Sequence, residues 1–312
     1  MNIVLGAAVT GIDFEAPAVQ VKNHPDFVAD IVIGADGLKS LCREALLGKP
    51  DPPHLTGDLA YRITVSREDM MKFEELRELV DTPAITYWMG PDAHGVGYLL
   101  KGGELFNLVI ACPDNLPELV HTAKADLQEM NALFKDWDPK LRALLSVVEE
   151  TSKWRLQNSE EMKTWSHPSG KFALMGDACH ATLPYLAQGA AQAIEDGAVL
   201  GALMEKIEHK AQLPDILVIY ERLRKGRTTK VVKGSTAYRE IFHLPDGARQ
   251  RERDRQLLDE KPFEGYPNRW KDPVFQPWLF GYDAHAEVEA AWEVYKMGRF
   301  PLTYGRHDVS RL

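Results

Sequence analysis

The sequence predicts an α/β protein in which an incomplete parallel sheet is interrupted by an antiparallel-sheet region and followed by helices. Two apolar segments that end in Gly and Asp, Val28–Gly37 and Gly170–Asp177, are typical of buried parallel strands. Between them, apolar segments separated by Gly and Pro turns indicate antiparallel strands. The chain has 312 residues, enough for one large or two ordinary domains with a sizeable core.

The first part of the chain is predicted to be mainly strands. Ile3–Ile12 and Val19–Lys22 are short apolar segments, and the β-branched segment Val28–Gly37 predicts a strand that is buried on both faces. A short helix, Lys39–Leu47, is expected to end at Gly48, because glycine commonly follows the last turn of a helix.

The middle of the chain is predicted to form an antiparallel sheet. The expected strands are Leu59–Val65, Ala84–Met89, Val96–Leu100 and Leu105–Ala111. A charged helix, Arg67–Val80, interrupts them, and polar helical segments follow from Pro117 to Glu150.

After the strand Gly170–Asp177 the chain is predicted to be helical. Gln188–Met204 is rich in Ala and Gly, which indicates close packing against a sheet or a ligand. Pro214 opens a helix that reaches about Lys225, and Ala284–Met297 is a last amphipathic helix. The changes in pattern predict four parts, residues 1–57, 58–155, 156–240 and 241–312.

Composition and charge exclude several classes of protein. The net charge of −9 and the pI of about 5.6 argue against nucleic-acid binding, which needs a positive face for the phosphates. No apolar segment approaches the roughly 20 residues of a membrane-spanning helix. Three widely spaced cysteines predict neither a disulfide framework nor a zinc site, and no basic residue precedes the first apolar segment as in a signal peptide. We therefore expect a cytoplasmic protein, and the sequence makes no prediction of its oligomeric state.

Common catalytic motifs are missing from the sequence. It contains no GxxxxGK[ST], HExxH, GxSxG or GxGxxG. P-loop phosphoryl transfer, zinc proteolysis and serine-triad hydrolysis therefore lose support.

The segment Gly176–Asp196 has the composition of a ligand-binding turn. A buried strand places Asp177 at its carboxyl end, where ligands bind in open α/β sheets, and a carboxylate there can accept hydrogen bonds from sugar-like hydroxyls. Gly176 allows close approach and Pro184 stiffens the loop. The next helix begins at Gln188, Gly189 and Ala190. Its unpaired N–H groups and its positive dipole end favour negative charge on a ligand.

The segment Gly34–Arg43 repeats this layout. A strand leads to Asp36 and Gly37 at the turn, and the following helix carries Ser40 and Arg43. Contact with a cofactor and a structural ion pair between Asp36 and Arg43 are equally open interpretations.

These two segments resemble the motifs of single-component flavin-dependent aromatic hydroxylases, the group typified by salicylate hydroxylase, and fungal members in particular. The segment Gly176–Asp196 is similar to the family's second flavin motif, and Ala35–Gly37 with Ser40 and Arg43 to its internal DG motif. Further similar segments are Ala60–Arg62, Trp88–His94 and Trp278–Asp283. The resemblance extends over nearly the whole chain.

The resemblance implies an incomplete Rossmann-like FAD-binding domain, an antiparallel-sheet substrate domain over the flavin and C-terminal helices. It implies FAD as cofactor, with Asp177 holding the ribitol and the loop Pro184–Ala190 lying along the isoalloxazine. NAD(P)H would reduce the flavin, and one oxygen atom of O2 would be transferred to an electron-rich aromatic ring. The cofactor-binding residues expected from the two motifs are Asp36, Gly37, Arg43, Gly176, Asp177, Pro184, Gln188, Gly189 and Ala190.

Arg62 and Tyr98, on predicted strands of the antiparallel sheet, are the expected catalytic residues that orient a small acidic phenol. A surface position of Arg62 is the open alternative. His94 beside a Gly-Pro turn is expected to be exposed, and Cys179 to be a small core residue. The basic residues Arg222, Arg224, Lys225, Arg227, Lys230 and Lys233 are expected to form a solvated helix face, with a docking surface as the alternative.

The chain departs from the family in one respect. Family members begin with a βαβ unit that carries GxGxxG and cradles the ADP pyrophosphate, and this sequence has no such motif. We therefore keep two expectations: a truncated chain, or a protein that works without that cradle. The second functional hypothesis is a family remnant or binding protein without flavin turnover, and a flavin enzyme that oxidises or cyclises without hydroxylation is a third.

Overall fold

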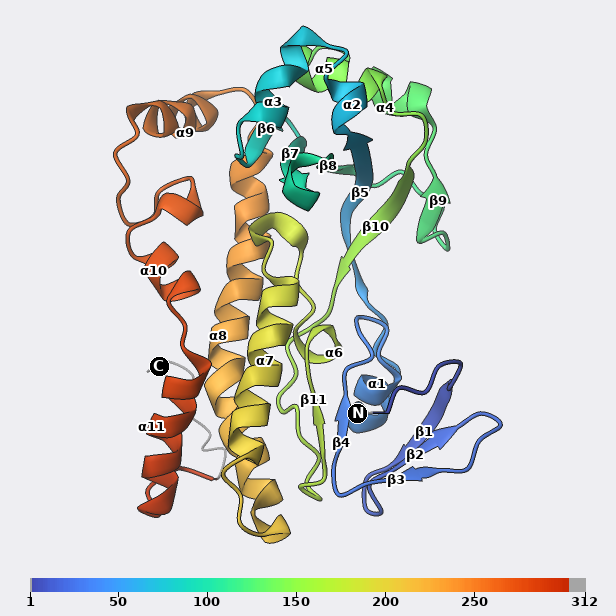
Figure 1. Ribbon diagram of the computed structural model, residues 1–312, viewed down its shortest axis with the longest axis vertical. Helices are drawn as coiled ribbons and strands as arrows, with labels where there is room; N and C mark the ends of the chain where they lie inside the picture. The colour runs from blue at the N-terminus through green and yellow to red at the C-terminus, as the bar shows by residue number, and fades with distance from the viewer. Residues whose placement is uncertain (1, 303–312) are drawn as a thin grey trace. The chain divides into compact units, whose positions relative to one another are not determined.

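The computed structural model describes residues 2–302, and its contacts divide the chain into two compact units. The first unit comprises residues 1–54, 158–238 and 274–312, and the second comprises residues 55–157 and 239–273 (Figure 1). The expected boundaries after residues 57 and 155 lie within three residues of the divisions after 54 and 157. Residues 241–312, expected as one helical extension, are divided between the two units.

The first unit contains two small sheets and most of the long helices. Its strands are β1 (Val9–Asp13), β2 (Ala18–Val21), β3 (Phe27–Val28), β4 (Val32–Gly34) and β11 (Phe172–Leu174). Its helices are α1 (Leu41–Leu47), α6 (Asp177–His180), α7 (Gly189–Met204), α8 (Leu213–Phe242), α10 (Phe275–Phe280) and α11 (Ala284–Lys296). The last four residues of α8 belong to the second unit.

Strands β4 and β11 form the parallel pair that positions the two motif segments. Phe172 lies opposite Val32, and Leu174 opposite Gly34. A side chain at Gly34 would overlap Cys42, because its Cβ would lie 2.6 Å from the Cβ of Cys42. Since parallel strands end at the same edge of a sheet, the turns after β4 and β11 both leave from one edge.

Strand β11 is held at its start by a close contact between glycine and proline. A Cβ at Gly170, which has φ +69°, would lie 2.9 Å from the Cα of Pro214 at the beginning of α8. Within the core, the Tyr220 hydroxyl donates to the carbonyl of Leu174 at 3.0 Å. Apolar side chains of β11, α7, α8 and α11 close around these residues; Phe172, Leu203, Leu217 and Val288 are fully buried.

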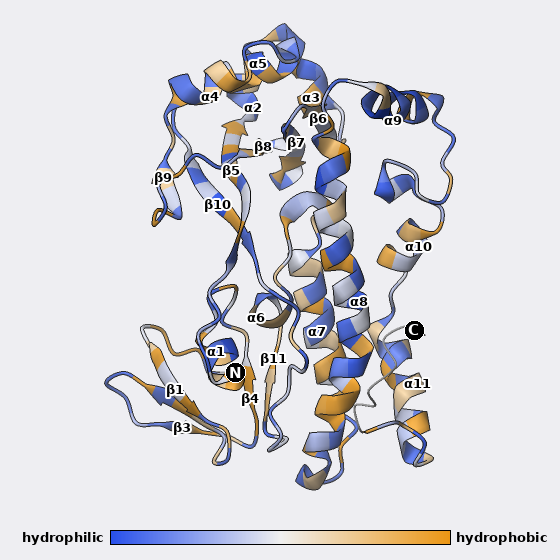
Figure 2. Cartoon of the chain, turned by 180° about the vertical axis from the view of Figure 1, so that it is seen from behind, coloured by the Kyte–Doolittle hydropathy of each residue, from blue (hydrophilic) through white to orange (hydrophobic). Residues whose placement is uncertain are grey.

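The second unit is a six-stranded antiparallel sheet with helices on one face. Its strands are β5 (His54–Ser66), β6 (Thr86–Gly90), β7 (Ala93–Leu100), β8 (Leu105–Pro113), β9 (Thr122–Lys124) and β10 (Ser152–Asn158), in the order β6-β7-β8-β5-β10-β9. Its helices are α2 (Arg67–Met70), α3 (Arg77–Asp81), α4 (Leu127–Leu133), α5 (Pro139–Ser146) and α9 (Ala248–Asp259). Figure 2 shows that α9 is almost entirely hydrophilic, as its run of arginines and acids requires.

Alternation along β5 gives the sheet two different faces. Leu59, Tyr61 and Ile63 are buried in the core under the short helices, whereas Arg62 and Thr64 between and beyond them are exposed. The face opposite the core therefore carries the exposed side chains of Arg62 and Thr64, whereas Asp58 and Ala60 on the same face are buried.

Several predicted elements differ from the structure. Residues Val28–Gly37 do not form one buried strand: Val28 is 72% exposed in β3, and only Val32–Gly34 belong to β4. The polar Asp30 separates the two short strands, and β3 pairs with β2 in a different sheet. The expected helix Arg67–Val80 is broken near Phe73, whose backbone is extended.

Helix α8 is longer than the sequence indicates. The prediction ended it near Lys225, but it continues through Gly226 and Gly234 to Phe242. Each helical glycine costs about 1 kcal/mol relative to alanine. The buried side chains of Val231 and Tyr238 offset that cost by packing.

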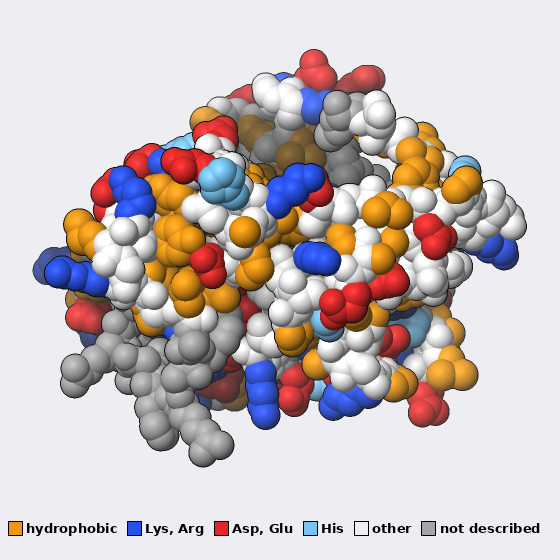
Figure 3. All heavy atoms as spheres, turned by 90° about the horizontal axis from the view of Figure 1, so that it is seen from below, with side chains coloured by type: hydrophobic (Ala, Val, Ile, Leu, Met, Phe, Trp, Pro, Cys, Tyr) orange, Lys and Arg blue, Asp and Glu red, His pale blue; other side chains and the backbone are white. Residues whose placement is uncertain are grey.

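The N-terminal segment leaves apolar side chains at the surface. Ile3 is 72% and Leu5 86% exposed, and of the expected strand Ile3–Ile12 only residues 9–12 belong to a strand, β1. The space-filling view shows apolar side chains mixed with charged ones over the face it displays (Figure 3). Among the described helices, none combines the length and apolar character that crossing a membrane requires.

Candidate functional site

The turn after β11 places a carboxylate at the sheet edge. Gly176 has φ +62° and ψ −144°, a conformation that glycine adopts far more readily than other residues, and it is the N-cap of α6. A Cβ there would lie 3.2 Å from the Cβ of Ala193 in α7. Glycine at this position therefore lets the backbone turn sharply against α7 and project Asp177 outward.

Asp177 is exposed, and its carboxylate forms no hydrogen bond or ion pair within residues 2–302. Desolvation nevertheless raises the pKa of this carboxyl above its ordinary value, and the charge of the nearby His180 lowers it in part. A partly desolvated carboxylate without a partner is an available acceptor for hydroxyl groups of a ligand.

Helix α7 begins beside Asp177 without a cap. Its N-cap residue Gln188 forms no capping hydrogen bond, so the first N–H groups of this 16-residue helix are not satisfied by a side chain. The Asp177 Oδ1 lies 4.0 Å from the position that a Cβ of Gly189 would occupy. Asp177 and the uncapped helix start are therefore neighbours, with only a glycine between them.

The loop between α6 and α7 exposes small residues around that start. Pro184, Ala187 and Ala190 are exposed, and Ala187 has a left-handed backbone with φ +51°. An acceptor carboxylate, exposed small residues and unsatisfied N–H groups fit the sugar-alcohol chain and the electron-accepting ring of a flavin. The residues present therefore fit this part of the cofactor.

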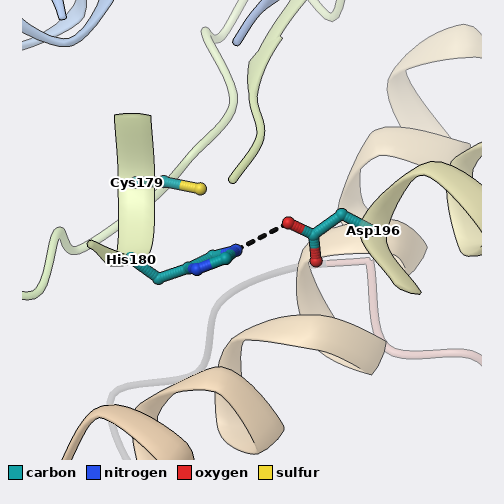
Figure 4. A group of neighbouring side chains, drawn as sticks. All are labelled: Cys179, His180 and Asp196. Atoms are coloured by element: carbon teal, nitrogen blue, oxygen red, sulfur yellow. Dashed lines mark hydrogen bonds and ion pairs between the residues drawn. The ribbon is translucent and has the colours of Figure 1, made fainter. Parts of the chain in front are cut away.

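A buried cluster lies behind this surface. Cys179, His180 and Asp196 place their ligand atoms within 4.8 Å of one another, close enough to hold a metal ion (Figure 4). His180 Nε2 lies 2.6 Å from Asp196 Oδ2, which also accepts from the Gly176 N–H at 3.0 Å. Arg224 occupies the other oxygen of Asp196 at 2.7 Å. Because protein donors engage both oxygens, the cluster forms a structural hydrogen-bond network.

Cys179 agrees with its expected role as a small core residue. Its thiol is 2% exposed, and desolvation raises its pKa well above the ordinary value, so the reactive thiolate is disfavoured. The three cysteines Cys42, Cys112 and Cys179 are all buried and free.

The turn after β4 uses its charged residues internally. Asp36 accepts from the Ser40 hydroxyl at 2.5 Å and from the Cys42 N–H at 3.0 Å, while Ser40 is the N-cap residue of α1 and accepts from the Arg43 N–H at 2.8 Å. Arg43 is 3% exposed and pairs with Asp51 at 2.6 Å, while its Nη2 donates to the carbonyl of Glu160 at 2.6 Å. The suggested ion pair between Asp36 and Arg43 is therefore wrong: the two residues have different partners.

Gly37 has φ +79° and open space where a Cβ would stand. Its turn geometry, not a close approach, accounts for the glycine. A cofactor role of Asp36, Gly37 and Arg43 stays a prediction: Asp36 is bonded at the start of α1, and Arg43 links this helix to Asp51 and Glu160.

Arg62 and Tyr98 project from the same face of the second unit's sheet. Arg62 pairs with Val109, and Val109 pairs with Val96, two residues before Tyr98. Side chains two residues apart share a face, and this register separates the two Cα atoms by roughly 12 Å. Both residues are exposed, with Tyr98 at 36%. Arg62 is therefore an exposed residue on the face opposite the core, and its role toward a substrate stays a prediction.

An open groove of about 560 Å³ surrounds Arg62. Its lining comes from β5, β9, β10 and the residues before β10: Arg62, Lys124, Glu150, Thr151, Ser152 and Trp154. Lys124 and Glu150 form a loose ion pair at 3.6 Å, whereas the Arg62 guanidinium has no partner among the described residues. The groove combines a free cation with an indole ring.

His94 lies on this same face but is 3% exposed, so the expectation that it is exposed is wrong. Its Nδ1 lies 2.8 Å from Nε2 of His243, the residue after α8. Burial lowers the pKa of His94 to about 3 and that of His243 to about 4, so both are neutral at physiological pH. The sequence contains one signal for the position of His94: its two-residue spacing from Val96 and Tyr98 places all three side chains on one face of β7.

The basic residues of α8 do not form one solvated face. Arg224 is fully buried and Arg227 is 8% exposed, and both pair with acidic residues of α7. Lys230 and Lys233 are exposed, and the Lys230 Nζ lies 4.0 Å from the ring centre of Trp278. The expected solvated face is therefore wrong for its two central arginines, whose partners Glu195 and Asp196 lie on another helix.

Comparison with known proteins places these features in a family. The family model described as an FAD binding domain matches residues 13–235. FAD-dependent monooxygenase OpS4 of Beauveria bassiana (strain ARSEF 2860) is 43% identical over 296 residues, which cover 93% of this chain and 69% of that protein. 3-Hydroxybenzoate 6-hydroxylase of Polaromonas naphthalenivorans (strain CJ2) is 32% identical, over 81% of this chain and 58% of its own length.

A solved structure agrees with this relationship. The substrate complex of salicylate hydroxylase has a TM-score of 0.76 and 25% identity, over 91% of this chain and 70% of that one. The chain thus spans about two thirds, or less, of the length of these three proteins. It contains the FAD-binding domain and belongs to the family of FAD-dependent monooxygenases.

Proposed function

We propose that this protein is an FAD-dependent monooxygenase that hydroxylates a phenolic or aromatic-acid substrate with NAD(P)H and O2. The observation that carries the proposal is the unpartnered carboxylate of Asp177 beside the uncapped start of α7. An exposed acceptor and a set of exposed donors meet there across a single glycine, as a flavin with both hydroxyl and carbonyl groups requires.

On the flavin side, Asp177 accepts hydrogen bonds from the ribityl chain. The N–H groups of Gly189 and Ala190 lie at the positive end of the helix dipole and would favour negative charge on the ring of a bound flavin. Gly176, Pro184 and Gln188 shape the loop between these two contacts. Bound FAD supplies the redox chemistry and the activation of O2.

On the substrate side, Arg62 binds the anionic group and Tyr98 orients the ring from the same sheet face. A guanidinium binds a carboxylate or phenolate through paired hydrogen bonds, and the indole of Trp154 offers a flat apolar wall next to it. A small aromatic acid suits a groove with this pair of features. The relatives named for hydroxybenzoate and salicylate chemistry support the same substrate class.

The assay for this proposal measures product, not only cofactor consumption. The purified protein with added FAD, NADPH and O2 is offered salicylate and 3-hydroxybenzoate, and mass spectrometry detects a product with one added oxygen atom. We expect product to form and to require FAD. NADPH consumption with hydrogen peroxide but no oxygenated product would point to an oxidase, and absence of flavin binding would favour a binding protein without turnover.

Arg62→Gln tests the substrate-binding role. We expect KM for the aromatic acid to rise about tenfold or more, since one charge-assisted interaction is lost, while flavin affinity stays unchanged. Arg142→Gln is the matched control, because Arg142 is an exposed arginine on α5 outside the groove. An unchanged KM in Arg62→Gln would remove Arg62 from the substrate site.

We also propose a cytoplasmic location. The support is that Cys42, Cys112 and Cys179 are buried thiols without disulfides, as is usual in a reducing compartment. Location of a tagged protein by fractionation tests this directly.

A further inference from the structure

Arg224 of α8 is the centre of a buried network in the first unit. It is fully buried and sits against the face of Tyr282, with its Cζ 5.1 Å from the ring centre. Its Nε donates to Asp196 at 2.7 Å, and its Nη1 donates to Glu195 at 2.6 Å. Its Nη2 donates to the carbonyl and the side chain of Gln192, at 3.1 and 2.9 Å. The guanidinium therefore directs all three of its nitrogens to α7.

One branch of this network leads to the first end of the flavin-binding segment. Asp196, held by Arg224, accepts from the N–H of Gly176 and contacts Nε2 of His180. Gly176 immediately precedes Asp177 and carries the strained backbone that projects it. The position of the Asp177 carboxylate thus depends on the carboxylate of Asp196.

The other branch leads to the opposite end of the same segment. Gln192, whose side-chain oxygen accepts from Arg224, directs its Nε2 to Oε1 of Gln188 at 3.4 Å. Gln188 is the N-cap residue of α7. Arg224 is therefore linked to both ends of the segment from Gly176 to Gln188 and contacts none of its exposed residues.

We propose that Arg224 is a positioning residue that fixes the distance between the Asp177 carboxylate and the start of α7, and so presets the flavin contact. The inference rests on the proposed flavin-binding function of that segment. Lysine could supply the positive charge, but all its N–H donors leave a single nitrogen. It therefore lacks the planar fork with which the guanidinium reaches three partners at once. Removal of the cation leaves the buried Asp196 uncompensated, which loosens the Gly176 turn.

Arg227 provides a matched control on the same helix. It is also buried, and it also pairs with Glu195, through Nε at 2.6 Å. Its Nη2 donates to the other oxygen of Glu195 at 2.8 Å, and its remaining bonds go to the carbonyls of Trp278 and Leu279, at 3.0 and 2.8 Å. A general loss of packing would affect variants of both arginines, whereas a positioning role predicts that only Arg224 changes the segment from Gly176 to Gln188.

The first experiment measures amide hydrogen exchange in the protein without flavin. In Arg224→Gln we expect exchange at Gly176 and over residues 177–180 and 188–192 to increase by about tenfold or more, because the hydrogen bonds that close this segment are lost. In Arg227→Gln we expect the increase at residues 278–282 instead. Equal increases in both variants, or an unchanged Gly176 amide in Arg224→Gln, would overturn the proposal.

The second experiment measures binding of FAD and of riboflavin by fluorescence quenching, with visible circular dichroism of the bound flavin. We expect Arg224→Gln to weaken both ligands by about tenfold, Arg224→Lys to recover part of this loss, and Arg227→Gln to bind as wild type. Should Arg224→Gln fail to fold, Gln192→Leu cuts only the second branch and should raise exchange at Gln188 but not at Gly176. Wild-type protein that binds no flavin refutes the proposed function, whereas the exchange result still tests Arg224.

Discussion

The two motif segments, Gly34–Arg43 and Gly176–Asp196, have the same layout but use their aspartates differently. Both follow a strand of the same parallel pair and lead into a helix. The two carboxylate oxygens of Asp36 accept hydrogen bonds from the Ser40 hydroxyl and the Cys42 N–H at the start of the following helix. Asp177 forms no bond in the described chain, and the adjacent turn is held by Asp196 from the next helix instead.

The comparison indicates that an aspartate after a strand is available to a ligand when another residue makes the hydrogen bonds that hold the turn. In the segment around Asp177 that residue is Asp196, which holds the Gly176 N–H and is itself held by Arg224. Around Asp36, Ser40 is the N-cap residue of α1, and both oxygens of Asp36 are engaged there, one by the Ser40 hydroxyl and one by the Cys42 N–H. Variants of the two aspartates and of the neighbouring glycines can therefore distinguish a structural role from a ligand-binding role.

The largest expected effect is on flavin affinity. Asp177→Ala should weaken FAD binding by roughly 10- to 100-fold, the equivalent of about 1.5–3 kcal/mol for hydrogen bonds to a charged group. Asp36→Ala should change FAD affinity by much less. Fluorescence titration of both variants measures this, and equal losses would break the comparison by giving Asp36 a ligand role.

Substitution of the glycine should destabilise the protein more in the turn before Asp177 than in the turn after Asp36. Gly176→Ala should lower the free energy of unfolding by about 1–3 kcal/mol, since the new Cβ is strained in that backbone and meets Ala193. Gly37→Ala should cost about 1 kcal/mol, because its φ is positive but the space is open. Chemical denaturation compares the two, and a larger loss at Gly37 would contradict the packing described here.

Removal of the Asp36 carboxylate from the start of α1 should lower the stability of the protein and leave FAD binding nearly unchanged. Asp36→Ala should lower the free energy of unfolding by roughly 1 kcal/mol, a typical cost for loss of a helix-start acceptor. Asp36→Asn should recover part of it, because an amide oxygen can still accept from the Ser40 hydroxyl or the Cys42 N–H. Thermal unfolding without flavin measures both variants; a stability equal to wild type in Asp36→Ala would show that Asp36 does not stabilise the start of α1.

The smallest effect concerns pH. Because desolvation raises the pKa of Asp177 in the folded protein, the native state holds its proton more tightly than the unfolded chain. This term makes stability fall as the pH rises from the unfolded value near 4 through the folded pKa. Asp177→Asn should therefore be slightly more stable than wild type at pH 7 in the absence of flavin, and equal to it below pH 3, by denaturation at both pH values.

The local sequence pattern predicted those elements that are determined by residues close to one another in the chain. The strands β5 and β8 follow from their apolar periodicity, and the turn at Asp177 follows from a short buried segment that ends in Gly-Asp. Both signals depend on residues within a few positions, so they survive without knowledge of the tertiary fold.

Tertiary partners explain what the sequence did not predict. Arg224 and Arg227 have the spacing of an ordinary charged helix, and only the approach of Glu195 and Asp196 from α7 makes them buried. The Gly-Pro turn beside His94 predicts an exposed side chain, and its burial depends on His243, which lies 149 residues away. The length of α8 likewise depends on core contacts that outweigh its glycines.

The brevity of β11 has a consequence for any attempt to transplant or redesign this turn. A strand of three residues has too few ladder bonds to fix its own register, so its placement is set by what meets its two ends. At one end Gly170 lies directly against Pro214, and at the other the Gly176 amide meets Asp196. A graft that copied only the loop would lose both anchors, so the smallest portable unit is the strand together with the two long helices that grip it.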